Sequence, residues 1–159
     1  MADPQDLMPE QDSLYATMGL HRIAEITAEG TARLEYEARP NMCHSGGVVQ
    51  GGFVTGWIDA AMAHAAIARS GQQFTPMTLE IKVSFFAPVR PGQVVAEGWA
   101  VRHGRKTCFY EGTLKDAAGT VLAKASSTMM LADRARVEAA AKAALEPGPP
   151  PGSDIQQVV

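Results

Sequence analysis

Residues 40–66, PNMCHSGGVVQGGFVTGWIDAAMAHAA, decide the fold of this 159-residue chain. A glycine-rich loop leads into an apolar segment that predicts a helix over residues 51–70, with Gly71 as its C-cap. Asp59 is the only acidic residue of that segment. A helix that is apolar on nearly all sides must be covered on most of them, and a buried carboxylate is costly unless it is paired or used. The stretch therefore predicts a central helix with a candidate catalytic acid.

The rest of the chain predicts strands. Alternating apolar and polar residues, separated by turns that contain glycine, proline or aspartate, are typical of an antiparallel sheet. The predicted class is α+β, with one curved antiparallel sheet wrapped around the long central helix. A helical turn is expected near residues 14–18, and strands are expected over residues 21–27, 31–38, 78–88, 94–102, 106–115 and 120–131.

The chain is long enough for one domain with its own core, which we place at residues 14–132. Residues 1–13 are polar, contain two prolines and are expected to be flexible. Residues 133–145 are rich in alanine and predict a C-terminal helix. Residues 146–159, EPGPPPGSDIQQVV, have the composition of a disordered tail.

The composition excludes several classes of protein. A net charge of −3 argues against nucleic-acid binding, which needs a basic face. No apolar run is long enough to span a membrane, and the acidic N-terminus lacks the pattern of a secretion signal, so we expect a cytoplasmic protein. Cys43 and Cys108 are too few for a disulfide framework. The four histidines and two cysteines lack the spacing of a zinc site, so neither a metal nor a cofactor is expected.

The loop and helix resemble acyl-CoA thioesterases of the PaaI-like (phenylacetate-pathway) type, which have the hotdog fold. In this family a loop Asn or Gln is followed by a glycine and then by His-Gly-Gly, and an acid follows nine residues after the His. Here His44 stands at the Asn position, Gly47 matches the loop glycine, and Gln50 begins QGG in place of HGG. Asp59 has the family's spacing. The following strand, TLEIKVSFFAP, aligns Thr78 with a family Ser or Thr near the acid.

The resemblance implies hydrolysis of an acyl-CoA thioester to a free acid and coenzyme A. The Gly51 N–H would polarise the carbonyl, and Asp59 would act as general base on water or as nucleophile. Thr78 would bind the carboxylate or the water, His44 would donate to the carbonyl or orient the water, and Gln50 would shape the loop. The structural alternative is that Asp59 pairs with a basic neighbour, either His64 or Arg69.

Gly51 and Asp59 cannot reach the same carbon atom from one chain. They are eight residues apart on one helix, which separates them by about 12 Å along its axis. If both are catalytic, the site is shared between two subunits, in agreement with the homodimer interface that the resemblance implies. Self-association as a homodimer or as a dimer of dimers (a homotetramer) is therefore expected.

The sequence also contains candidates for binding coenzyme A. Arg102, Arg105 and Lys106 form a basic cluster at a predicted turn, and Arg90 is a second candidate. Such side chains bind the phosphates of coenzyme A well. The alternative is a solvated hairpin tip. The acyl group is not fixed by the sequence, although we expect its tunnel to be lined by residues such as Phe53, Trp57, Met62 and Phe86.

Two other functions remain open. A non-catalytic acyl-CoA-binding module is compatible with the replacement of the family's His and Asn by Gln50 and His44. An acyl-thioester hydratase or dehydratase is less favoured, because the His-x-Asp arrangement of the hydratases is missing at His44.

Overall fold

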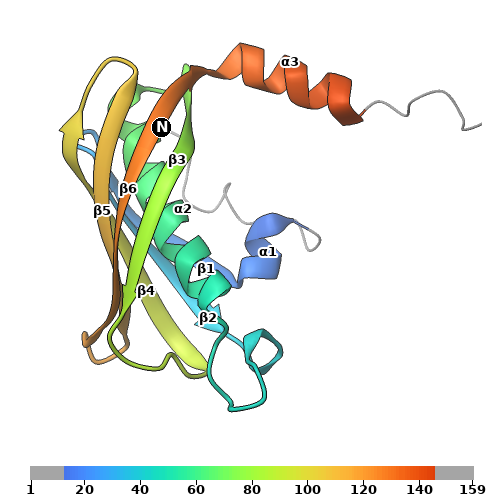
Figure 1. The fold of residues 1–159 in the computed structure, drawn as a ribbon, viewed down its shortest axis with the longest axis vertical. Coiled ribbons are helices and arrows are strands. Elements are labelled where there is room, and N and C mark those ends of the chain that lie inside the picture. Colours follow the sequence, from blue (N-terminus) through green and yellow to red (C-terminus); the bar gives the residue numbers. More distant parts are fainter. Residues whose placement is uncertain (1–12, 146–159) are drawn as a thin grey trace, which may run out of the picture.

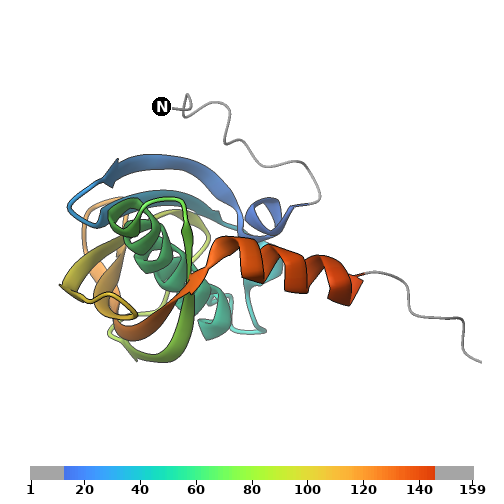
Figure 2. The same cartoon turned by 90° about the horizontal axis from the view of Figure 1, so that it is seen from above.

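A computed structural model describes residues 13–145 of the chain. A six-stranded, fully antiparallel sheet curves around one long helix, as Figures 1 and 2 show from two sides. The flexible segment predicted over residues 1–13 lies, except for Ser13, outside the described residues, as does the tail predicted over residues 146–159. The elements are α1 (Leu14–Met18), β1 (Leu20–Thr27), β2 (Thr31–Ala38), a 3-10 turn η2 (Pro40–Met42), α2 (Gly51–Ser70), β3 (Phe74–Phe85), β4 (Gly92–His103), β5 (Thr107–Asp116), β6 (Val121–Asp133) and α3 (Arg134–Leu145).

The predicted α+β architecture is confirmed. The strand order is β1-β2-β4-β5-β6-β3, so the strand that follows the central helix crosses to the far edge of the sheet. The central helix spans Gly51–Ser70, as the sequence predicts, with Gln50 as its N-cap and Gly71 as its C-cap. α3 continues β6 and projects away from the sheet (Figure 1).

One face of α2 packs on the sheet at a contact built from two glycines. Gly98 of β4 and Gly112 of β5 are paired neighbours. A Cβ atom added at Gly98 would lie 2.6 Å from the backbone of Ala61, and one added at Gly112 would lie 2.7 Å from the side chain of Ile58. The helix therefore rests almost directly on the strands. The buried residues of this face are Val54, Trp57, Ile58, Ala61, Met62, Ala65 and Ala66.

The opposite face of α2 is only partly covered. Helix α1 lies along one flank, where the indole N–H of Trp57 donates to the backbone oxygen of Met18 at 2.8 Å. The Met18 side chain also occupies the space that a Cβ at Gly56 would need. Asp59 lies on the face that remains, and it is half-buried. The helix is therefore covered on most sides, as the sequence predicts, and the face that carries Asp59 stays partly open among the described residues of one chain.

Strand β3 begins at Phe74, four residues earlier than the sequence predicts. The early part contains Pro76, which is tolerated because β3 is an edge strand. A bulge lies between Thr78 and Glu80, where β3 has one residue more than β6. This extra residue places Thr78 opposite the fully buried Met129, on the inner face of the sheet.

Candidate active site

The acid of the central helix meets the edge strand. The Thr78 hydroxyl donates a hydrogen bond of 2.9 Å to Oδ1 of Asp59. Asp59 belongs to the third turn of α2, and Thr78 points at it because the bulge in β3 turns its side chain inward. Helix α2 and strand β3 follow each other in sequence. The two residues come into contact because β3 crosses to the edge of the sheet, next to β6.

The surroundings of Asp59 favour its neutral form. Burial raises the pKa of its carboxyl group, and the hydrogen bond from Thr78 opposes this in part. Asp59 makes no ion pair with any residue in the part of the chain that the structure describes. A carboxylate that is half-buried, unpaired and raised in pKa is suited to accept a proton from water near neutral pH.

The structural alternative for Asp59 is not seen. His64 donates from Nδ1 to the backbone oxygen of Ala60 at 2.7 Å, and its Nε2 lies 3.3 Å from the hydroxyl of Tyr15. Burial lowers the pKa of His64, with the hydrogen bond to Ala60 opposing it. Arg69 donates to the backbone oxygen of Glu29 at 2.7 Å. Neither basic residue is therefore a partner of the acid.

The N-terminus of α2 presents one backbone donor. The side-chain oxygen of Gln50 accepts a hydrogen bond from Gly52 N–H at 2.6 Å and so caps the helix. Gly51 N–H makes no hydrogen bond within residues 13–145. The ring of Phe85 lies against Gly51, where an added Cβ would be 3.2 Å from the ring. The capping by Gln50 thus leaves Gly51 as a free donor beside an aromatic wall.

An apolar groove opens at this donor. It has a volume of about 460 Å³ and lies between the loop that precedes α2 and the end of β3. Phe86, which is 62% exposed, forms part of its wall. Its lining consists of Val48, Val49, Gly51, Val54, Phe85, Phe86, Ala87, Pro88 and Val89. Of the residues expected to line an acyl tunnel, Phe86 lines this groove, whereas Trp57 and Met62 are fully buried in the core.

His44 lies on the exposed loop before the helix. Its Nδ1 accepts a hydrogen bond from Gly46 N–H at 3.1 Å, so the proton of the neutral ring is on Nε2. Nε2–H is then a donor that is available to a ligand. The structure gives no contact between His44 and Asp59, so one chain does not bring them together.

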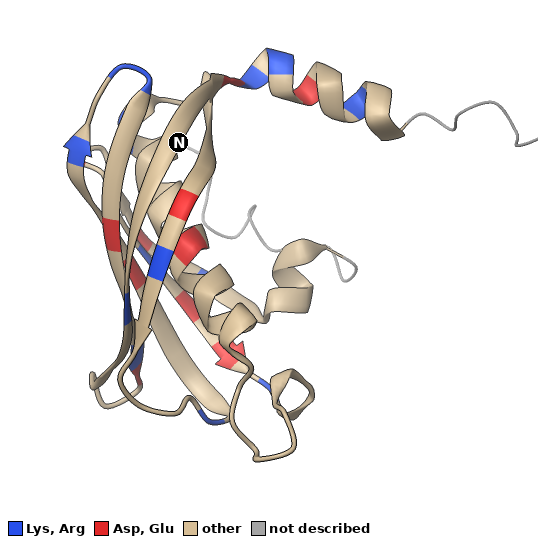
Figure 3. Cartoon of the chain, in the orientation of Figure 1, with Lys and Arg blue, Asp and Glu red and all other residues tan. Residues whose placement is uncertain are grey.

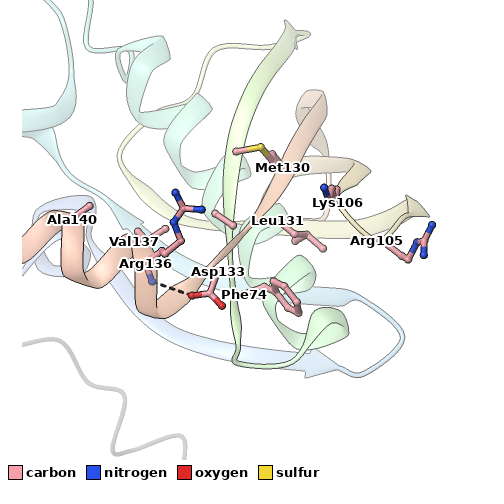
Figure 4. Close-up of a pocket in the computed structure, with 10 residues that line it drawn as sticks. Phe74, Arg105, Lys106, Met130, Leu131, Asp133, Arg136, Val137 and Ala140 are labelled. Carbon is pink, nitrogen blue, oxygen red and sulfur yellow. Dashed lines mark hydrogen bonds between the residues drawn. The ribbon is translucent and has the colours of Figure 1, made fainter.

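The four basic residues predicted to bind coenzyme A do not form one cluster in the structure. Lys and Arg residues occur at the β4–β5 hairpin tip and at the start of α3, where the ribbon is blue in Figure 3. Arg105 and Lys106 line a groove together with Arg136 of α3, a residue that the sequence does not single out (Figure 4). Arg102 and Arg90 do not line this groove, and Arg90 lies in the loop between β3 and β4.

Over residues 13–145, no group of three or more His, Cys, Asp or Glu side chains could hold a metal ion. The same residues contain no helix long and apolar enough to cross a membrane.

Comparisons with known proteins place this chain in a family. Residues 46–123 match the family model described as the thioesterase superfamily. A protein of Saccharolobus solfataricus named "Putative esterase SSO2140" is 30% identical over 129 residues, which cover 79% of this chain and 90% of the relative. The chain therefore belongs to the thioesterase superfamily, a class of acyl-thioester hydrolases.

Solved structures agree with this assignment. A mutant form of the phenylacetic acid degradation protein PaaI from Thermus thermophilus is 25% identical with a TM-score of 0.66, over 75% of this chain and 98% of that protein. The Streptococcus mutans protein smu.793, solved bound to acetyl-CoA, is 20% identical with a TM-score of 0.64, over 70% of this chain and 87% of that protein. The hotdog fold and the PaaI-like resemblance are thereby confirmed.

Two contributors to the site are missed by the sequence. Phe85 is read there as one apolar residue of an alternating strand, yet it contacts Gly51. The bulge residue Leu79 is 61% exposed, although simple alternation with Ile81 predicts that it faces inward. No local signal in TLEIKVSF identifies the bulge.

Proposed function

We propose that this protein hydrolyses acyl-CoA thioesters. The acyl carbon gains a bond to the oxygen of water and loses its bond to sulfur, and the proton removed from water ends on the thiol of coenzyme A. Asp59 accepts that proton as general base, while the Gly51 N–H of the partner subunit donates to the carbonyl oxygen as it becomes negative. The observation that carries the proposal is the half-buried Asp59 carboxylate, bonded to Thr78 and free of ion pairs among the described residues.

Asp59 as nucleophile is the variant of this mechanism. It would attack the acyl carbon and displace the coenzyme A thiolate to form an anhydride, and water would then hydrolyse the anhydride to the free acid and regenerate the Asp59 carboxylate. In either case Thr78 holds one carboxylate oxygen and leaves the other for the reaction. The free Nε2–H of His44 can donate a hydrogen bond to the carbonyl or to the water, and the side-chain amide of Gln50 caps the N-terminus of α2.

The geometry of one chain supports a shared site. Gly51 and Asp59 are separated by about 12 Å along α2, so if both act on the same carbon atom, a second copy supplies one of them. The exposed edge strand β3 is suited to receive this copy, because it presents unpaired backbone groups and large apolar side chains. Those side chains are Met77, Leu79 and Phe85, followed by Phe86 just beyond the strand.

The bulge in β3 suggests a register for such a dimer. We infer that β3 pairs antiparallel with β3 of the partner subunit about a two-fold axis at Lys82. Residues equally far before and after Lys82 then face each other, with inward residues opposite inward ones. The extra residue of the bulge brings Thr78, four before the axis, opposite Phe85, three after it. Since Phe85 contacts Gly51, the Asp59 of one subunit approaches the Gly51 of the other.

The acyl group fits the apolar groove beside Gly51. A carbonyl oxygen on the Gly51 N–H directs the acyl chain between Phe85 and Phe86, among residues that offer no charge. The acetyl-CoA bound by smu.793 supports a coenzyme A thioester as substrate, because that protein has the same fold.

A pair of variants tests the donor. Gly51→Pro removes the N–H at the first helical position, where proline is tolerated, and Gln50 already has the extended backbone that a following proline requires. Gly51→Ala adds a Cβ but keeps the N–H. We expect thiol release from an acyl-CoA panel to fall ~10²–10³-fold in Gly51→Pro and much less in Gly51→Ala. Equal losses in both would contradict a role for the N–H.

Mixing variants tests the sharing. Hybrid dimers of Gly51→Pro and Asp59→Asn contain one site with both functional groups intact. We expect the mixture, after unfolding and refolding together, to regain activity that neither variant shows alone. If the mixture is as inactive as each variant alone, the site is not shared between subunits. If the natural chain binds acyl-CoA without turnover, the protein is a binding module and not a thioesterase.

A further inference from the structure

A second groove lies between the β4–β5 hairpin and α3, away from Gly51. Its volume is about 1080 Å³. Figure 4 shows Arg105 and Lys106 on one side, Arg136 of α3 on the other, and Phe74 of β3 between them. The remaining lining is mostly apolar: Met130, Leu131, Ala132, Val137 and Ala140, with Asp133.

The cations of this groove have no partners of opposite charge among the described residues. Arg105, Lys106 and Arg136 take part in none of the ion pairs found over residues 13–145. The single carboxylate of the lining, Asp133, accepts a hydrogen bond from the backbone N–H of Arg136 at 3.0 Å and thus caps α3. Three exposed cations around an apolar floor, in a chain of net charge −3, fit a ligand with anionic groups and a flat apolar body.

Strand β3 connects this groove with the candidate active site. Phe74 lines the groove, and Thr78, four residues further on, binds Asp59. The pairing with β6 is regular over this segment, so the separation is about 13 Å along the strand. The pantetheine arm of coenzyme A, which joins two amide units in series, can span such a distance.

We propose that this groove binds the phosphorylated adenosine end of coenzyme A, with Arg136 as a binding residue that acts together with Arg105 and Lys106. The phosphates lie among the three cations, and the adenine packs on the apolar floor. The helix α3, which projects from the sheet, thereby becomes one wall of the substrate site. The inference rests on the proposed function, because it takes the substrate to be a coenzyme A thioester.

Matched substrates provide the test. In the full chain, an acyl-CoA and the corresponding acyl-pantetheine differ only in the nucleotide end. We expect Arg136→Ala to raise KM for the acyl-CoA about tenfold, the loss of one charge-assisted hydrogen bond, and to leave KM for the acyl-pantetheine unchanged. Arg134→Ala is the control, since it removes the same charge from the same helix but does not line the groove. Arg105→Ala should repeat the effect from the hairpin side.

Direct binding separates this inference from the proposed function. Adenosine 3′,5′-bisphosphate should bind the natural chain in a calorimeter and bind Arg136→Ala at least about tenfold more weakly. If neither thioester is hydrolysed, the proposed function fails, while bisphosphate binding still decides the groove. Hydrolysis of both thioesters with equal KM, or no bisphosphate binding, would overturn the groove assignment. Binding to phosphatidylglycerol vesicles without binding of the bisphosphate would assign the groove to a lipid surface, and this result would also overturn the groove assignment.

Discussion

The Thr78 hydroxyl donates a 2.9 Å hydrogen bond to Oδ1 of Asp59 and thereby joins the edge strand β3 to the central helix α2. Burial raises the pKa of Asp59, and this contact holds the acid in position and opposes that effect. Thr78 fixes one carboxylate oxygen, and its donated hydrogen bond offsets part of the effect of burial on the pKa.

Asp59→Asn should strongly reduce activity and stabilise the protein. We expect turnover to fall by about 10²–10⁴, as for the loss of a general base. The pKa of Asp59 is raised in the folded state, so its ionisation opposes folding at neutral pH. The neutral amide removes that penalty, and Tm at pH 7 should rise. A lower Tm with retained turnover would contradict both expectations; Glu25→Gln, at an exposed position of β1, is the control.

Thr78→Val should move the pH profile. Without the hydroxyl, the carboxyl group of Asp59 loses the hydrogen bond that lowers its pKa, so the acidic limb of kcat/KM should shift to higher pH. Thr78→Ser keeps the donor and should retain the natural profile. The measurement is kcat/KM across the acidic and neutral pH range. Identical acidic limbs in the natural chain and in Thr78→Val would exclude that Thr78 lowers the pKa of the catalytic acid.

Lys82→Cys should form a covalent dimer on mild oxidation. The register inferred above places this position opposite its own copy, within the Cα separation that a disulfide requires. Ser84→Cys is the control, because it lies on the same strand and the same face but not at the axis. Non-reducing electrophoresis decides the matter. Equal cross-linking of both variants, or none in Lys82→Cys, would reject the register.

Phe86→Ala should change the choice of acyl group. It removes an exposed aromatic wall of the groove beside Gly51. We expect KM for long or aromatic acyl-CoA substrates to rise by about tenfold, and that for acetyl-CoA to change little. Leu14→Ala removes another exposed apolar side chain, away from this groove. It should leave the ratio of the KM values for long or aromatic acyl-CoA and for acetyl-CoA unchanged. A uniform change across the panel would place the acyl group elsewhere.

Gly98→Ala should destabilise the fold. The added methyl group would lie 2.6 Å from the backbone of α2, which has no room to move without leaving the sheet. We expect a loss of about 1–3 kcal/mol, typical of an overpacked core, measured by urea unfolding. An unchanged midpoint would show that the helix does not rest on this glycine.

Much of the fold is legible in the sequence, for physical reasons. The bounds of α2 follow from its apolar run and from Gly71, and the period-two pattern locates the strands. The start of β3 is missed because Pro76 reads as a strand breaker, although an edge position tolerates it. The position of Phe85 against Gly51 depends on a crossover that joins distant elements, which no local pattern encodes.

The direction of Thr78 illustrates the same limit. In TLEIKVSF, strict alternation turns Leu79 inward with Ile81 and turns Thr78 toward solvent. Only the comparison with a family strand suggests that Thr78 lies near the acid. The structure contains the contact because the chain accepts an exposed leucine at the bulge. Such a local conflict with the hydrophobic pattern is typical of a functional position.

That bulge decides which residue of strand β3 lies against the acid. If the strand slipped by one residue, Leu79 would replace Thr78 opposite Met129, the leucine would gain burial, and the acid would face a hydrocarbon instead of a hydroxyl. We therefore expect substitutions that favour a flat β3 to abolish activity without unfolding the protein. If a variant of this chain folds well but is inactive, a change in the register of strand β3 against β6 is the first explanation to examine.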